Sequence, residues 1–164
     1  MYMAMIAQDV DNLGGKVLRM DWDGNPAPDN PFGNRVYSYG HRNPQGLTFS
    51  DSGQLYLSEH GPANDDEVNR IVAGGNYGWP HIEGFCDTPE EVSACDSLTQ
   101  IPPIAAWTPT EAPCGMSYFN HPSIPEWENT LLLCFLKQQH LKVLHLDDAG
   151  ETVELEEKMW EQEM

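Results

Sequence analysis

The sequence is short of basic residues, because 8 lysines and arginines stand against 26 aspartates and glutamates. The formal net charge is −18 at pH 7. Nucleic acid and anionic membrane surfaces would repel such a chain, so neither is expected as a partner. The surplus of carboxylates fits a solvated acidic surface or sites that hold cations.

Long apolar runs are missing as well. No stretch approaches the roughly 18 apolar residues that a membrane-spanning helix needs, so membrane insertion is not expected. The opening MYMAMIAQDVDN has no basic segment and only a short apolar run, so it is not predicted to be a signal peptide. No long stretch has the 3.6-residue period of an amphipathic helix.

Several enzyme signatures are absent. The chain has no P-loop, no dinucleotide fingerprint, no G-x-S-x-G elbow and no HExxH motif. Its cysteines are few (Cys86, Cys95, Cys114 and Cys134) and lack CxxC spacing, which makes a zinc site improbable. Cys86 and Cys95 flank a short acidic loop. They are either a disulfide, which would suit a periplasmic or secreted protein, or two free thiols.

What the sequence does contain is alternating apolar segments punctuated by 14 glycines and 13 prolines. Residues 46–50 and 54–58 predict a hairpin around the turn at 51–53. Further strands are predicted at 16–22, 67–72, 130–136 and 141–146, so the chain is predicted to be an all-β domain spanning residues 1–164. The side chains expected in its core are Leu18, Leu47, Phe49, Leu55, Leu57, Leu132, Leu144 and Leu146.

Two internal similarities predict a β-propeller. KVLRMDWDG (residues 16–24) resembles KVLHLDDAG (142–150), and QGLTF (45–49) resembles CGMSY (114–118). The first offset of 126 residues equals three repeats of about 42, which lies within the usual blade period of about 40–45. The chain therefore offers about three to four blades, and we expect it to be part of a longer protein.

Two clusters of polar residues are candidate binding sites. Arg42, with Asn43 and Gln45 beside it, could clamp a ligand that carries several oxygens, or it could form an ion pair with a carboxylate such as Glu59. The segment EHGPANDDE (59–67) offers hard oxygen ligands for Ca²⁺. Its alternative interpretation is a solvated acidic loop.

These stretches also resemble a known family. GHRNPQGLTF, SEHGPANDDEVNRI and GGNYGWP, in this order, are similar to the glucose/sorbosone dehydrogenases, six-bladed propellers that use pyrroloquinoline quinone (PQQ). The resemblance covers residues 12–148, and the acidic end at 149–164 is of uncertain structure. It implies a PQQ-dependent quinoprotein that oxidises an aldose at C1 to the lactone.

The resemblance also implies site residues. Arg42 and Asn43 match residues that contact the quinone oxygens, Gln45 matches a further polar contact, and Lys137 matches a partner of a PQQ carboxylate. The carbonyls of Gly61 and Pro62 match those that hold the Ca²⁺ beside PQQ. Glu67 and the carbonyl of Tyr77 match a second, structural Ca²⁺ site.

Part of the family's active site has no counterpart here. The catalytic histidine is expected upstream of the Arg42 motif, yet residues 1–39 contain no histidine, and no arginine follows Arg70. We therefore identify no catalytic residue in this chain. We expect it to bind Ca²⁺, to bind PQQ weakly and to oxidise no sugar by itself.

The resemblance further implies a sugar substrate, an electron acceptor and a periplasmic or secreted location, and it allows a homodimer. Two alternatives stay open. One is a non-enzymatic propeller that serves as a binding module, like the hedgehog-interacting relatives of this domain. The other is a degenerate fragment stabilised by calcium.

Overall fold

The computed structural model describes residues 4–160, so residues 161–164 of the acidic end lie outside the described part. The chain forms two compact units, each built from two separate segments. The first unit comprises Met1–Asn43 and Ile71–Pro102, and the second comprises Pro44–Arg70 and Pro103–Met164. Each unit is described by itself below.

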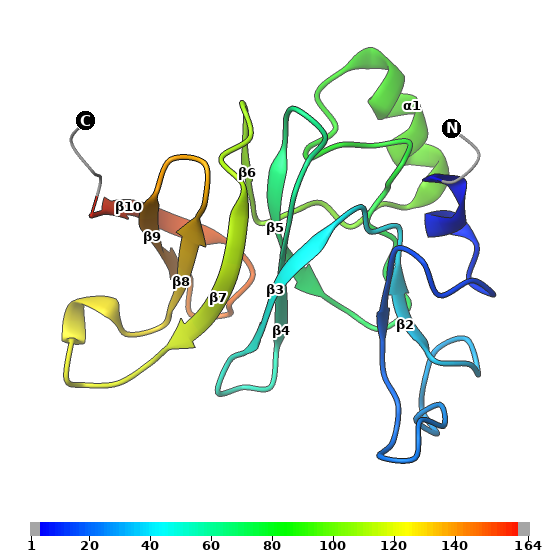
Figure 1. Ribbon diagram of the computed structural model, residues 1–164, viewed down its shortest axis with the longest axis horizontal. Helices are drawn as coiled ribbons and strands as arrows, with labels where there is room; N and C mark the ends of the chain where they lie inside the picture. The colour runs from blue at the N-terminus through cyan, green and yellow to red at the C-terminus, as the bar shows by residue number, and fades with distance from the viewer. Residues whose placement is uncertain (1–3, 161–164) are drawn as a thin grey trace. The chain divides into compact units, whose positions relative to one another are not determined.

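The second unit contains two four-stranded sheets in which successive strands are neighbours (Figure 1). The first sheet runs β3 (Pro44–Phe49), β4 (Leu55–Glu59), β5 (Asp66–Ile71) and β6 (Ala105–Trp107). The second runs β7 (Pro113–Phe119), β8 (Thr130–Phe135), β9 (His140–Leu146) and β10 (Val153–Met159), with the short 3₁₀ helix η2 (Pro125–Trp127) between β7 and β8. Four-stranded meanders of this kind are the blades of a propeller.

The core of the second unit lies between these two sheets. Tyr56 and Val68 come from the first sheet, and they form one buried cluster with five side chains of the second: Leu131, Leu133, Phe135, Leu144 and Leu146. Burying each aliphatic or aromatic side chain contributes roughly 1.5–3 kcal/mol. At the close approach of β3 and β7, a Cβ on Gly46 would lie 2.6 Å from the Cys114 carbonyl oxygen. Glycine therefore allows the two blades to pack closely here.

The expected core is only partly confirmed. Leu55, Leu57, Leu144 and Leu146 are buried, and Leu18 and Leu132 are half-buried. Leu47 and Phe49 were predicted wrongly, since they are 54% and 62% exposed. The face of β3 that meets β7 carries Gly46 and Thr48, whose hydroxyl accepts a hydrogen bond from the Tyr118 amide. The apolar alternate residues therefore point to the opposite face.

The internal repeats correspond to equivalent structural positions. QGLTF lies in β3 and CGMSY in β7, and each of these strands opens its sheet. The two KVL segments are followed by the same kind of turn. Asp21 and Asp147 each accept hydrogen bonds from downstream backbone amides, and these bonds lower the pKa of both carboxyl groups. The resemblance between the segments therefore reflects repeated local structure.

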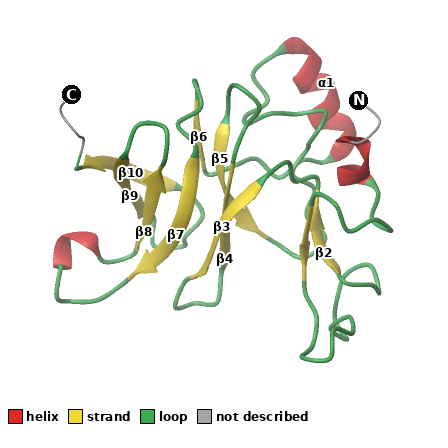
Figure 2. Cartoon of the chain, viewed as in Figure 1, coloured by secondary structure: helices red, strands yellow, loops and turns green. Residues whose placement is uncertain are grey.

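The first unit contains the 3₁₀ helix η1 (Ala4–Gln8), a two-stranded antiparallel sheet and one α-helix (Figure 2). The sheet pairs β1 (Lys16–Leu18) with β2 (Val36–Tyr39). The helix α1 (Pro89–Leu98) was not expected from the sequence. It begins at a capping box in which the Thr88 hydroxyl accepts from the Glu91 amide and the Glu91 carboxylate accepts from the Thr88 amide.

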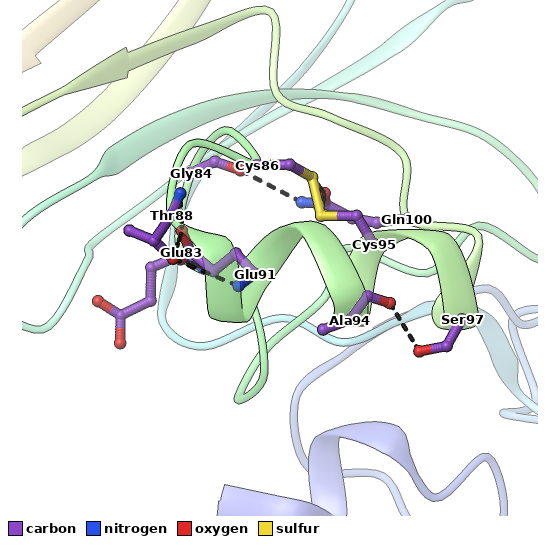
Figure 3. Close-up of a disulfide and its surroundings, with 9 residues drawn as sticks. All are labelled: Glu83, Gly84, Cys86, Thr88, Glu91, Ala94, Cys95, Ser97 and Gln100. Carbon is purple, nitrogen blue, oxygen red and sulfur yellow. Dashed lines mark hydrogen bonds between the residues drawn. A yellow bond between two sulfur atoms is a disulfide. The ribbon is translucent and has the colours of Figure 1, made fainter.

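A disulfide joins Cys86 to Cys95, so the first of the two readings of these cysteines is confirmed (Figure 3). Their Cα atoms are 6.5 Å apart, and the bond fastens α1 to the loop that precedes it. Across residues 4–160, no helix is long and apolar enough to cross a bilayer. Apart from α1 and the two 3₁₀ turns, the described elements are strands, which confirms the all-β class.

Candidate functional site

Arg42 and Asn43 follow β2 on a loop whose backbone amides are hydrogen-bonded to other segments of the first unit. The Gly40 amide donates to the Ala7 carbonyl at 2.9 Å, and the His41 amide donates to the Gly15 carbonyl at 3.1 Å. The His41 ring is buried, hydrogen-bonds the Ser38 hydroxyl at 2.8 Å and stacks on Tyr77. The residues that directly precede Arg42 and Asn43 are therefore fixed by hydrogen bonds and packing.

The two residues line a pocket of about 430 Å³ in the first unit. The Arg42 guanidinium carbon lies 5.3 Å from the centroid of the Trp79 ring, which is within cation–π range. The remaining pocket residues are small or apolar, apart from the histidine: Ala4, Ile6, Ala7, Gly15 and His41. A cation, an amide and an aromatic face thus meet in a space that a small planar molecule could enter.

Tyr77 belongs to the same unit and is 2% exposed. Its ring centroid lies 4.6 Å from that of His41, and its hydroxyl accepts from the Val72 amide at 3.0 Å. Its own amide donates to the Tyr39 carbonyl at 2.9 Å. Tyr77 is therefore fixed close to the residue that precedes Arg42.

Gln45, Gly61, Pro62 and Lys137 lie at one end of the second unit. β3 begins and β4 ends there, because Pro44 pairs with Glu59, and β7 begins and β8 ends there, because Pro113 pairs with Phe135. The Lys137 ammonium donates to the Thr110 hydroxyl at 3.3 Å, and the Thr110 amide donates to the Ala63 carbonyl at 3.2 Å. The loops that carry Lys137 and Gly61–Pro62 are thus joined through Thr110.

Asp66 anchors this group of loops. It is fully buried, and its carboxylate accepts hydrogen bonds from the Gly61 amide at 3.0 Å and from the amides of Glu111 and Ala112. The sequence placed Asp66 among possible cation ligands. The structure instead places it as the first residue of β5, where its carboxylate holds backbone amides.

Glu59, Glu67 and Asn69 form a buried polar group near this end. The Asn69 amide nitrogen donates to a Glu59 oxygen at 3.0 Å and to a Glu67 oxygen at 2.9 Å. The Asn69 amide oxygen is buried without a hydrogen-bond partner. Two carboxylates and an unsatisfied amide oxygen are hard ligands of the type that Ca²⁺ takes.

Within residues 4–160, no three His, Cys, Asp or Glu side chains lie close enough together to hold a metal ion. The predicted ligands include the carbonyls of Gly61, Pro62 and Tyr77, so the donor set fits Ca²⁺ chemically.

A buried ionic network that was not predicted from the sequence lies close to the turn between β8 and β9, which contains Lys137. The Lys142 ammonium contacts Glu111 at 2.9 Å and Glu156 at 2.8 Å, and it lies 4.5 Å from the centroid of the Trp107 ring. The buried His140 ring stacks on Phe135, and its Nε2 lies 3.1 Å from a Glu111 oxygen. The network joins β6, β9 and β10 to the loop that contains Glu111.

The structure thus divides the predicted site residues between its two units. Arg42, Asn43 and Tyr77 belong to the first, and Gln45, Gly61, Pro62, Glu67 and Lys137 belong to the second. The chain passes between the units at Asn43–Pro44, inside the Arg42 motif.

Comparison with known proteins gives one consistent result. The sequence model described as Glucose / Sorbosone dehydrogenase matches residues 3–164. The aldose sugar dehydrogenase YliI of Escherichia coli is 36% identical over 154 residues, covering 86% of this chain and 41% of that protein. Quinoprotein glucose dehydrogenase B of Acinetobacter calcoaceticus is 51% identical over 84 residues, 49% of this chain and 18% of the relative.

A solved structure agrees with these matches. The PQQ-bound aldose sugar dehydrogenase of Streptomyces coelicolor is 37% identical, with a TM-score of 0.80 over 96% of this chain and 42% of that protein. The chain spans about two fifths of the length of such relatives. These structural neighbours are PQQ-dependent dehydrogenases with a β-propeller fold. The match of the family's sequence model over residues 3–164 shows that the chain belongs to the glucose/sorbosone dehydrogenase family.

Proposed function

We propose that the chain contributes part of a PQQ site to an enzyme that oxidises an aldose at C1 to the lactone and passes the electrons to an external acceptor. The observation that carries the proposal is the pocket of about 430 Å³ in which Arg42 and Asn43 lie beside the Trp79 ring. Membership of the family, and relatives named as quinoprotein and PQQ-bound sugar dehydrogenases, support it.

Each residue proposed for PQQ has a physical role. PQQ is a planar tricarboxylate, and its ortho-quinone supplies a two-electron acceptor when bound. The Arg42 guanidinium and the Asn43 amide would donate hydrogen bonds to the quinone oxygens of bound PQQ and stabilise negative charge there. Lys137 offers a cation to a carboxylate, and Gln45 offers an amide. Trp79 supplies an aromatic face beside the arginine.

Ca²⁺ is proposed at two places. The carbonyls of Gly61 and Pro62 would hold one ion, and Glu67 with the carbonyl of Tyr77 would hold a structural ion. The support is the turn that Asp66 fixes at Gly61, together with the Asn69 amide, whose nitrogen donates to Glu67 and whose oxygen is buried without a hydrogen-bond partner. The Cys86–Cys95 disulfide supports a periplasmic or secreted location, because structural disulfides persist in oxidising compartments.

PQQ binding by the purified chain tests the proposal. Titration with PQQ in the presence of Ca²⁺, followed by quenching of tryptophan fluorescence, should give a saturable isotherm. Arg42→Ala should weaken binding about 10–100-fold, because a charge-assisted contact contributes about 1.5–3 kcal/mol. Arg19→Ala is the matched control, since Arg19 pairs with Asp29 and does not line the pocket. Equal affinity in the wild type and Arg42→Ala, or no saturable binding, would overturn the proposal.

A further inference from the structure

Cys114 and Cys134, the cysteines outside the Cys86–Cys95 disulfide, lie opposite each other on neighbouring strands. β7 and β8 pair through Pro113 with Phe135 and through Met116 with Leu133, and the register shifts between these pairs. Cys134 therefore lies opposite both Cys114 and Gly115, and two residues facing one is the arrangement of a β-bulge.

The Cys114 thiol also contacts the Cys134 backbone. The Cys114 thiol donates to the Cys134 carbonyl oxygen, with 3.2 Å from sulfur to oxygen. Burial raises the pKa of the Cys134 thiol, and the Cys114 thiol raises it further through its charge and a hydrogen bond. The Cys114 sulfur therefore lies against the backbone of the residue opposite it.

The backbone separation expected for this pair fits a covalent bond. Opposite residues of an antiparallel pair have Cα atoms about 4.5–5.5 Å apart. Disulfides span Cα separations of about 4.4–6.8 Å. A bond between the two sulfurs thus needs rotation of the side chains and little displacement of the strands.

The redox setting favours the bond. Because Cys86 and Cys95 are already joined, the chain is suited to a compartment that oxidises thiols. Cys134 is exposed and Cys114 is half-buried, so an external disulfide can reach the pair.

We propose that Cys114 and Cys134 form a second, cross-strand disulfide by exchange with a small-molecule or protein disulfide. One cysteine thiolate attacks a sulfur of the external disulfide and releases one of its thiols. The second cysteine thiolate then attacks the mixed disulfide and releases the other thiol. The pair loses two protons and two electrons, and the external disulfide is reduced to two thiols.

The bond lies next to proposed site residues. The Cys114 carbonyl accepts from the Ser58 hydroxyl at 3.1 Å, and the neighbouring Pro113 carbonyl lies 2.6 Å from His60 Nε2. His60 directly precedes Gly61. The crosslink therefore fixes the bulge that packs against the start of the Gly61–Pro62 turn.

Glutamate-specific proteolysis tests the proposal, because cleavage after glutamate puts the four cysteines on four peptides: 84–90, 92–111, 112–126 and 129–151. The full chain is equilibrated with oxidised glutathione, blocked with N-ethylmaleimide and digested without reductant. We expect 112–126 linked to 129–151 and 84–90 linked to 92–111. The intact chain should be lighter by two hydrogen atoms than one with a single disulfide, and it should carry no maleimide.

Two variants sharpen the result. Cys134→Ser should leave one glutathione or one maleimide, on Cys114, and Cys114→Ser should leave one on Cys134, because neither variant has the second cysteine that releases the glutathione. Two maleimides or two glutathiones on the unmodified chain would overturn the proposal, and so would a crosslink from Cys134 to Cys86 or Cys95. The peptide map of the unmodified chain decides the question even if both variants fold poorly.

Discussion

The turn at Gly61 leaves no room for a side chain. A Cβ there would overlap the Asn64 carbonyl oxygen, while the Gly61 amide is held by Asp66. Gly61→Ala should therefore lower the free energy of unfolding by about 1–3 kcal/mol, the usual cost of forcing extra atoms into a packed site. The urea-unfolding midpoint measures this.

Gly115→Ala is the matched control for that substitution. Nothing lies within 4 Å of a Cβ at Gly115. The free energy of unfolding of this variant should therefore differ from that of the wild type by less than about 0.5 kcal/mol. Equal effects of the two substitutions would show that the Gly61 turn can open to accept a methyl group.

His140 should make stability depend on pH. Burial lowers its pKa, Lys158 and Lys142 lower it further, and Glu111 raises it. The unfolded chain, with a histidine pKa near 6.5, then binds more protons than the folded chain at mildly acidic pH. The contribution of His140 is thus fully present above about pH 6.5 and is lost as the pH falls through and below that value.

Unfolding midpoints at pH 7.5 and 5.5 check this dependence. His140→Gln should show a smaller fall between the two values than the wild type does. His121→Gln, at an exposed histidine, should leave the wild-type fall unchanged. A fall in His140→Gln as large as that of the wild type would assign the pH dependence to other groups.

Lys142 on β9 links the loop at Glu111 to β10 at Glu156, and its side chain is 4% exposed. Lys142→Met would leave Glu111 and Glu156 facing each other without a cation. We expect a loss of about 2–4 kcal/mol, on the low side for a buried ion pair because the Glu156 side chain is 38% exposed. Chemical unfolding measures the loss.

Lys158→Met makes the same change on the paired strand, because Lys158 is opposite Lys142. Lys158 is exposed, so its substitution should shift stability by less than about 0.5 kcal/mol. A comparable loss in both variants would mean that lysine charge in general, and not the Lys142 network, stabilises these strands.

Local signals in the sequence predicted the elements unevenly. The hairpin around 51–53 and the strands near 130–136 and 141–146 were predicted because turn residues and apolar alternation agreed there. The helix α1 was missed, since its apolar residues are few and its Thr88–Glu91 capping box was the one clear indication. Alternation also cannot say which face of a strand meets the next blade, and for this reason Leu47 and Phe49 were misplaced.

The site was predictable only where neighbouring residues form it. Arg42 and Asn43 are adjacent in the sequence, and they share one pocket. The Lys142 network was not predictable, because Glu111, Lys142 and Glu156 meet only after three distant segments pack together. The role of Asp66 was not predictable for the same reason, since its partners at Glu111 and Ala112 are more than 40 residues away.

The net charge of −18 should make the whole chain sensitive to ions. Raising NaCl from about 10 to 150 mM shortens the Debye length from about 30 to 8 Å and should raise the melting temperature by on the order of a few degrees. CaCl₂ at matched ionic strength should raise it further, because specific binding at about 100 times Kd adds about 2.7 kcal/mol.

Glu67→Gln separates the two effects. It should reduce the extra effect of Ca²⁺, by the share that the structural ion contributes, and leave the effect of NaCl, whereas Glu154→Gln, at an exposed glutamate, should keep both in full. Equal melting temperatures in CaCl₂ and in ionic-strength-matched NaCl for the wild type would contradict the proposed Ca²⁺ sites.

The interleaving of the two units constrains the order in which the chain can fold during synthesis. The first unit needs residues as late as Pro102, and the second needs strands as late as β10. Residues 44–70 therefore emerge from the ribosome before β6, the last strand of their own sheet, and long before β7–β10, the sheet against which they pack. Domains generally fold as units during translation. Until the later strands have been made, this segment therefore exposes the apolar face of its hairpin. A chaperone that binds extended apolar segments would find its target there.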